Sequence, residues 1–224
     1  MDFVYICRPG DNEELRYSIR SVFASFPDAN IWVIGGKPDW YGGNYVEVNA
    51  FDTDSKQDIA RWNMLYILYT PQINENFILM NDDFFIMKKI EFIDTWANGF
   101  LVDLIREKVS NRESMGYVRL LNQTLNELVE NGFENPLNFE LHIPMPMEKT
   151  KLAEVMEKYT LWRSGYGNMF EEFASDMDDV KIRPSKERIE GDFASTEDAW
   201  FHELLPRLQE LYPNPSPLEL DKKQ

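Results

Sequence analysis

Two adjacent carboxylates, Asp82 and Asp83, are the residues of this sequence whose types and spacing best suit a chemical role. They follow Asn81 and an apolar run at 77–80, and a second apolar run at 84–86 comes directly after them. Two like charges beside a hydrophobic core repel each other, and a hard cation reverses that cost. Because Mg²⁺ and Mn²⁺ take oxygen ligands and bridge diphosphate oxygens, the pair predicts a metal site for a nucleotide-activated donor. In the alternative, one aspartate caps a turn and the other is solvated.

Arginines in the first third of the chain could bind the phosphates of such a donor. Arg8 follows the first apolar run, and Arg16 and Arg20 lie four residues apart on one face of the helix expected there. Arg61 lies near the start of a second expected helix. For the helical arginines, ordinary ion pairing with nearby acids such as Glu13 is the alternative. The donor-binding residues predicted from this half of the chain are Tyr5, Arg8, Asp11, Arg16, Arg20, Arg61 and Asn81.

A regular alternation of strands and helices must position these residues. Apolar, β-rich runs predict strands at 3–7, 31–34, 45–48 and 77–80, and helical spacing predicts helices at 15–26 and 55–69. Asp11 with Glu14 forms a start like a capping box for the first helix, and Asp54 is the expected cap of the second. Strands separated by such helices form a mainly parallel sheet, which binds ligands beyond the carboxyl ends of its strands. The loops at 8–12 and 81–83 are therefore expected to face one crevice.

The second half of the chain is predicted to be more helical. Helices are expected near 116–130, 148–159, 167–175 and 196–211, with an extended piece at 139–144 between the first two. His142 lies in this extended piece, where a histidine is usually a hydrogen-bonded core residue and a functional role is the alternative. We expect a single domain over residues 1–224, in which 1–90 bind the donor and 91–224 form the acceptor side.

The sequence lacks the motifs of several other chemistries. It has no G-x-x-x-x-G-K-[ST] loop and no G-x-G-x-x-G after a strand, which argues against a P-loop or a dinucleotide site. Two histidines and one cysteine are too few for a zinc cluster. No G-x-S-x-G marks an acyl-transfer serine.

The net charge of −16 bears on the expected partners. Such a surface repels polyanions, so general binding to nucleic acid or to an anionic membrane is not expected. No stretch approaches the ~18 apolar residues of a membrane span, no signal-peptide pattern begins the chain, and the single Cys7 fits a reducing compartment. We therefore expect a cytoplasmic protein. The charge also supports a rival without enzymatic activity, an acidic mimic of DNA that blocks a nucleic-acid-binding partner.

Four segments, in order, resemble the Stealth proteins, which are capsular-polysaccharide and lysosomal-tag phosphotransferases related to GT-A sugar transferases. Residues 14–21 with 31–40 resemble their first block, and Phe-Ile-Leu-Met-Asn-Asp-Asp-Phe-Phe at 77–85 resembles their second, whose Asn-Asp-Asp binds metal and donor. Residues 142–144 and the following helix resemble the third, and 193–198 with 212–216 is similar to the C-terminal segment of short bacterial and phage-type members. The first strand departs from the pattern, since it ends in Cys-Arg-Pro-Gly-Asp where these proteins usually carry Trp-Val-Asp-Gly-Ser. The sequence therefore supports simple glycosyl transfer at least as well as phosphotransfer.

The resemblance implies a GT-A-like (Rossmann-like) α/β fold, with a mainly parallel sheet flanked by helices and a more helical C-terminal half. It implies a metal-dependent transferase that moves a sugar or sugar-phosphate from a nucleotide-sugar to an acceptor hydroxyl, on a glycan or on a hydroxylated DNA base of a phage. Asp82 and Asp83 would bind Mn²⁺ or Mg²⁺, and Arg163 joins the donor-binding residues. The catalytic base is expected to be His142 or Asp83. A phage-encoded member would act in the host cytoplasm.

Overall fold

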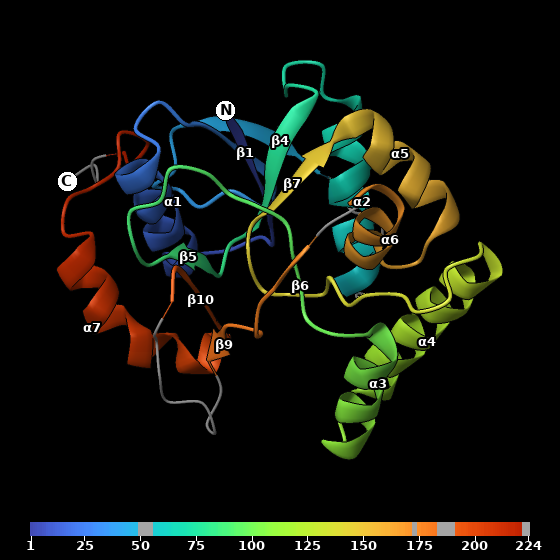
Figure 1. Ribbon diagram of the computed structural model, residues 1–224. Helices are drawn as coiled ribbons and strands as arrows, with labels where there is room; N and C mark the ends of the chain where they lie inside the picture. The colour runs from blue at the N-terminus through green and yellow to red at the C-terminus, as the bar shows by residue number, and fades with distance from the viewer. Residues whose placement is uncertain (49–55, 172–173, 183–190, 221–224) are drawn as a thin grey trace. The chain divides into compact units, whose positions relative to one another are not determined.

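The computed structural model describes residues 1–48, 56–171, 174–182 and 191–220 (Figure 1). Contacts divide the chain into two compact units. The first comprises Met1–Ile93, His142–Met147 and Val180–Gln224, and the second comprises Asp94–Leu141 and Glu148–Asp179. The expected division at residue 90 lies close to the first break between the units, but the C-terminal segment belongs to the first unit. The single domain over 1–224 stays a prediction.

A five-stranded sheet forms the centre of the first unit, in the order β3-β2-β1-β4-β7. Its strands are β1 (Asp2–Cys7), β2 (Asn30–Gly35), β3 (Asn44–Glu47), β4 (Asn76–Asn81) and β7 (Met145–Glu148). The pairs β1–β2, β2–β3 and β1–β4 are all parallel, which confirms the predicted mainly parallel sheet. The apolar runs that predicted β1 and β4 are buried, as strands covered on both faces require.

The two long helices of the first unit connect the strands in opposite directions. Helix α1 (Glu13–Ser25) leads from β1 outward to β2, and α2 (Lys56–Tyr69) leads from β3 back across the sheet to β4. In Figure 1 the two helices lie on opposite sides of β1. The direction of winding therefore reverses between β1 and β4, which is where open α/β sheets bind ligands. The predicted second helix is confirmed, while its expected cap Asp54 lies outside the described residues.

Helix α1 begins one residue later than the capping-box pattern predicted. Asn12 has extended backbone angles, and its Oδ1 accepts a hydrogen bond of 2.9 Å from the Leu15 amide. Asn12 therefore caps the helix, and the assignment of the cap to Asp11 was wrong. The capping side chain is buried, whereas Asp11 is exposed. The cap thus holds Asn12 at the carboxyl end of β1, next to the crevice.

A small three-stranded sheet of order β5-β10-β9 completes the first unit. β5 (Phe84–Ile86) pairs antiparallel with β10 (Phe193–Thr196), which pairs in parallel with β9 (Lys181–Ile182). Serines of α1 anchor β5, because Ser18 Oγ donates to the Phe84 carbonyl and Ser21 Oγ accepts from the Ile86 amide. The helix predicted at 196–211 instead begins at Phe201, as α7 (Phe201–Leu211), because Thr196 pairs with Ile182 of β9 and Asp198–Trp200 form a 3₁₀ turn.

The second unit is mainly helical, as predicted for this half of the chain. It contains α3 (Leu101–Ser110), α4 (Met115–Glu130), α5 (Lys149–Lys158) and α6 (Trp162–Phe170), with a short pair of strands, β6 (Trp96–Ala97) and β8 (Ser175–Asp176). α4 and α5 confirm their predictions, α3 was missed, and the helix predicted at 167–175 lies earlier in the chain. This helix is α6, and it ends before Glu171, whose backbone is extended (φ −101°, ψ 106°). Within the described ranges no helix has the length and apolar character to cross a bilayer.

Candidate functional site

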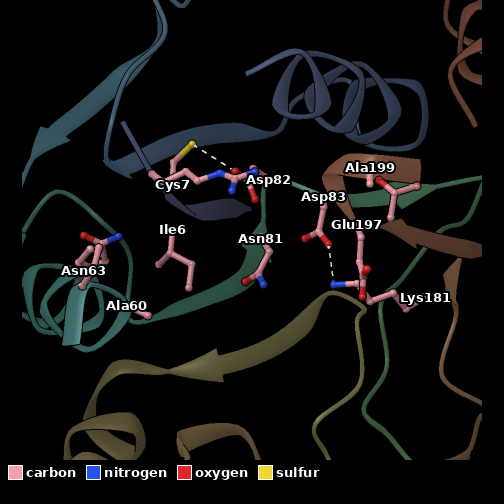
Figure 2. A pocket seen from close by; sticks show the side chains of 13 residues that line it. Ile6, Cys7, Ala60, Asn63, Asn81, Asp82, Asp83, Lys181, Glu197 and Ala199 are labelled. Atoms are coloured by element: carbon pink, nitrogen blue, oxygen red, sulfur yellow. Dashed lines mark hydrogen bonds and ion pairs between the residues drawn. The ribbon is translucent and has the colours of Figure 1, made fainter. Parts of the chain in front are cut away.

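The carboxyl ends of β1 and β4 meet at one edge of the central sheet (Figure 2). Ile6 pairs with Asn81 in parallel register, so Cys7 and Asp82 follow neighbouring positions. The strand register therefore brings the loop after β1 beside the Asn81–Asp82–Asp83 turn, as the parallel sheet predicted. Gly35, which ends β2 at φ +107°, approaches the same end of β1 from the other side, where a Cβ would lie 2.3 Å from the Cys7 carbonyl oxygen.

A cavity of about 620 Å³ opens at this edge of the sheet. Its floor comes from Cys7, Asn81 and the two aspartates, one wall from α2 and another from the segment that follows β10. Such a volume is typical of a site for a small ligand. Asn63 of α2 lines the cavity, is 3% exposed, and its Oδ1 makes no hydrogen bond within the described part of the chain. A ligand that donates a hydrogen bond would satisfy this buried acceptor.

Asp82 points toward β1 and the start of α1. Its Oδ2 accepts a hydrogen bond of 2.5 Å from Asn12 Nδ2 and lies 3.9 Å from the Cys7 thiol. The pKa of Asp82 is raised to about 6. Burial is the main cause and the neighbouring charge of Asp83 adds to it, against the lowering effect of the Asn12 hydrogen bond. A cation that bound this carboxylate would offset both causes of the raised pKa.

Asp83 points the other way, toward the small sheet. Its Oδ2 accepts a hydrogen bond of 2.7 Å from Ser195 Oγ and lies 3.7 Å from the Lys181 ammonium. Figure 2 shows Asp82 turned to Cys7 and Asp83 turned to Lys181. The two carboxylates are thus adjacent in sequence but are held by different elements.

The carboxylate oxygens of Asp82 and Asp83 are ligands of the kind that a hard divalent ion prefers. Among the described residues, no group of three or more histidine, cysteine, aspartate or glutamate side chains is arranged to hold a metal. Mg²⁺, however, is commonly held by one or two carboxylates together with waters and substrate phosphates. Burial and the charge of Asp83 raise the pKa of Asp82 despite the lowering effects of Asn12 and Arg8, so a cation bound there would be favourable. Both carboxylates have the oxygen chemistry for an ion whose coordination a diphosphate completes, and because their side chains point apart, one of them would have to turn for both to hold the same ion.

The structure places some of the predicted donor-binding residues at the cavity. Arg8 lines it, with half of its side chain exposed and its guanidinium 4.0 Å from Glu14. Asn81 lines it as well. Tyr5 instead lies in the core, where its hydroxyl is 3.0 Å from Ser18 Oγ and burial raises its pKa well above the usual range.

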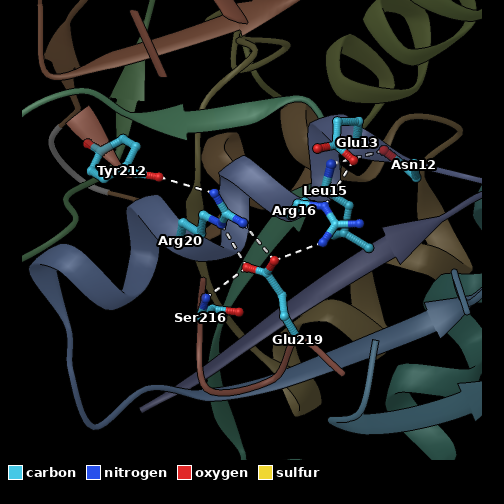
Figure 3. A network of polar contacts seen from close by, with 8 residues as sticks. All are labelled: Asn12, Glu13, Leu15, Arg16, Arg20, Tyr212, Ser216 and Glu219. Carbon is cyan, nitrogen blue, oxygen red and sulfur yellow. Dashed lines mark hydrogen bonds and ion pairs between the residues drawn. The ribbon is translucent and has the colours of Figure 1, made fainter. Parts of the chain in front are cut away.

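Other predicted site residues do not line the cavity as the structure describes it. Arg16 and Arg20 share a face of α1, as predicted, but their guanidinium groups bind the Glu219 carboxylate at 2.8 and 2.7 Å (Figure 3). Asp11 and Arg61 are exposed. Arg16 and Arg20 are therefore held by Glu219, and neither Asp11 nor Arg61 lines the cavity.

The two residues that the Stealth resemblance singled out in the second half lie in different units. His142 belongs to the first unit, where its ring meets Phe84 edge-on with centroids 6.5 Å apart. Arg163 belongs to α6 of the second unit and is 7% exposed. Their roles in catalysis and donor binding stay predictions.

Sequence reasoning missed four polar residues at the site. Lys181 and Ser195 reach Asp83 from strands of two and four residues, too short to show a strand pattern in the sequence. Asn12 was missed because the helix cap was assigned to Asp11. Asn63 was missed because it lies inside α2, where no sequence motif distinguishes it. The segment 193–198, which resembles the end of the Stealth proteins, was the one available signal for Ser195.

The fold and this site define the class to which the architecture belongs. A mainly parallel sheet with a switch point and an acidic turn at the end of β4 fits a GT-A-like α/β fold. Solved structures show the same fold. The galactosyltransferase LgtC, in complex with donor and acceptor sugar analogues, matches with a TM-score of 0.52 at 12% identity, over 97% of this chain and 98% of that one. An active-site mutant of LgtC matches with the same values. No family model and no curated protein matches the sequence.

Proposed function

We propose that this chain is a glycosyltransferase that moves a sugar from a nucleotide-sugar to an acceptor hydroxyl. The observation that carries the proposal is the position of the Asn81–Asp82–Asp83 turn, which lies on a cavity at the switch point of a GT-A sheet. The likeness to LgtC, a galactosyltransferase seen with donor and acceptor sugar analogues, supports the same class of reaction. The alternative is transfer of a sugar-phosphate, as in the Stealth proteins.

The donor's diphosphate would lie above the acidic turn. Asp82 and Asp83 would hold Mn²⁺ or Mg²⁺ there, and a bound ion would neutralise the charge that grows on the departing diphosphate. Arg8, half exposed at the rim, is placed to meet a phosphate oxygen. The buried Asn63 carboxamide would accept a hydrogen bond from the donor's ribose or base.

The acceptor hydroxyl needs a base when it attacks. We assign this role to Asp83 or His142, as the sequence predicted, with a glycan as the acceptor. Replacing His142 with Gln should lower turnover ~10²–10⁴-fold if it is the base, with little change in the melting temperature. If His142 only packs against Phe84, the same variant should lose ~1–3 kcal/mol of stability while its folded fraction keeps full turnover.

The test of the proposed function is a screen of nucleotide-sugars by thermal unfolding, with and without Mn²⁺. A true donor at 100 times its Kd adds ~2.7 kcal/mol of stability and raises the melting temperature. Asp83→Asn should remove the Mn²⁺-dependent part of that shift, and Asp28→Asn, at an exposed position, serves as the matched control. A mimic of DNA needs neither ion nor nucleotide, so the absence of a shift with every nucleotide-sugar would overturn the proposal.

A further inference from the structure

Two donors from paired strands converge on one oxygen of Asp83. Ser195 of β10 and Lys181 of β9 are partners in the parallel register of the small sheet. The Ser195 hydroxyl is 2.7 Å from Asp83 Oδ2, and the Lys181 ammonium is 3.7 Å from the same atom. The side chains of Lys181 and Asp83 are only 17% and 14% exposed. The small sheet thus already places a positive charge where a metal ligand is expected.

The two contacts differ in kind. The serine hydroxyl makes a full hydrogen bond, but 3.7 Å exceeds the ~2.7–2.9 Å of a direct hydrogen bond between an ammonium and a carboxylate. The Lys181 ammonium is carried on a flexible four-carbon stem, and Lys181 also lines the cavity. A short movement of this stem would bring the ammonium toward an anion in the cavity.

A divalent ion and the lysine cannot both be stabilised by Asp83 alone. Placed at the same oxygen, an ammonium and a divalent ion repel each other, and low exposure weakens the screening of that repulsion. A diphosphate brings enough negative charge to stabilise both cations. Lys181 could then leave Asp83 for a phosphate oxygen, and the carboxylate would become available to the ion.

We infer that Lys181 competes with the divalent ion for Asp83 in the donor-free protein and binds the donor's diphosphate once both are present. The lysine therefore makes metal binding depend on the donor. The second half of this inference rests on the proposed function, whereas the competition for Asp83 does not.

The test begins with Mn²⁺ alone, titrated into the nucleotide-free full chain by calorimetry. Lys181→Met should bind Mn²⁺ at least ~10-fold more tightly than the unmodified protein, because the competing charge is gone. Lys88→Met is the matched control, since Lys88 forms an exposed pair with Asp192 at 3.5 Å, away from the cavity. It should leave the Mn²⁺ affinity unchanged.

The second measurement uses UDP and GDP in the presence of saturating Mn²⁺. Lys181→Met should weaken binding of whichever diphosphate binds by ~10-fold or more, as expected for loss of a charged hydrogen bond. Lys181→Arg keeps the charge and should retain both the weak Mn²⁺ binding and most of the diphosphate affinity. This variant also separates loss of charge from a folding defect, which circular dichroism melting would report.

Each outcome decides the matter. Unchanged or undetectable Mn²⁺ binding in folded Lys181→Met, or in Lys181→Gln if the methionine variant does not fold, overturns the competition. Unchanged UDP and GDP affinity in the same variant overturns the phosphate contact. Tighter Mn²⁺ binding with no UDP or GDP binding to any variant leaves the competition intact and counts against the proposed function instead.

Discussion

Two groups of charged side chains in the first unit, the Glu219 cluster and the carboxylates at the cavity, differ in how they are satisfied. In the Glu219 cluster, formed by Arg16, Arg20 and Glu219, the arginines contact the glutamate at 2.8 Å or less (Figure 3). Burial opposes ionisation there, but hydrogen bonds from Arg20, the Ser216 amide and Arg16 outweigh it and lower the pKa of Glu219 to about 2. At the cavity, burial raises the pKa of Asp82 to about 6.

The opposite directions of these pKa shifts follow from the surroundings of each carboxylate. Two arginines pair with Glu219, which holds the C-terminal segment onto α1. For Asp82, burial and the charge of Asp83 outweigh the lowering effects of Asn12 and Arg8. The geometry therefore separates Arg16 and Arg20, which the sequence assigned to the donor, from the carboxylates at the cavity.

The largest expected effect comes from removing charge at the cavity. Asp83→Asn should lower transferase turnover by ~10²-fold or more, because the charge that binds the ion is lost, while the Ser195 hydrogen bond can persist. The free energy of unfolding should change little, because relief of the repulsion between Asp82 and Asp83 offsets the loss of the Lys181 pair. Steady-state kinetics and urea unfolding of the same preparation check both expectations. Normal turnover in this variant would place the chemistry elsewhere.

The next effect is on stability and lies in the Glu219 cluster. Glu219→Gln leaves two poorly exposed arginines without their carboxylate and should cost about 2–3 kcal/mol of unfolding free energy. Affinity for the donor should not change, since the cluster does not line the cavity as described. Urea unfolding and calorimetry measure the two quantities. A loss of donor affinity with unchanged stability would return Arg16 and Arg20 to the donor site.

The pH dependence of stability should differ between the two groups in metal-free buffer. The pKa of Glu219 is lowered, so its contribution is present above about 4.5 and is lost as pH falls toward about 2. The pKa of Asp82 is raised, so its contribution is present below about 3.8 and is lost as pH rises through about 6. Asp82→Asn should remove the second dependence, worth ~3 kcal/mol, and leave the first. Unfolding curves at several pH values would reveal a failure of either assignment.

The smallest expected effect is at Arg8. Its side chain is half exposed and its pair with Glu14 spans 4.0 Å, so Arg8→Ala should cost less than ~1 kcal/mol of stability. The affinity for a nucleoside diphosphate should nevertheless fall ~10-fold if the guanidinium meets a phosphate. Equal affinity in the variant and the unmodified chain would remove Arg8 from the donor site.

The central sheet could be predicted because its signals are local. β1, β2 and β4 are short apolar runs, β3 has only two apolar residues at its centre, and α1 and α2 show their apolar faces within a few turns. The position of Asp82 and Asp83 followed from the same logic, since they end an apolar strand. The local prediction that failed was the start of α1, where Asn12 rather than Asp11 makes the capping hydrogen bond.

The remaining contacts of the site join residues that are far apart in the sequence. Ser195 lies 112 residues after Asp83, and Glu219 lies 203 residues after Arg16. A spacing of four on a helix predicted correctly that Arg16 and Arg20 share a face, but it carries no information on which distant acid meets them. Short strands such as β9 exist only because β10 pairs with them, so Lys181 could not be assigned from its neighbours.

β9 and β10 belong to the first unit although they come late in the chain, and this affects the order of folding during synthesis. A ribosome that adds ~5–20 residues per second completes β1, α1 and β4 several seconds before it reaches Ser195. During that interval the two aspartates are already translated, but the serine and lysine that hold Asp83 are not. A nascent chain can therefore form its parallel sheet early, while the site matures only when the late strands dock against β5.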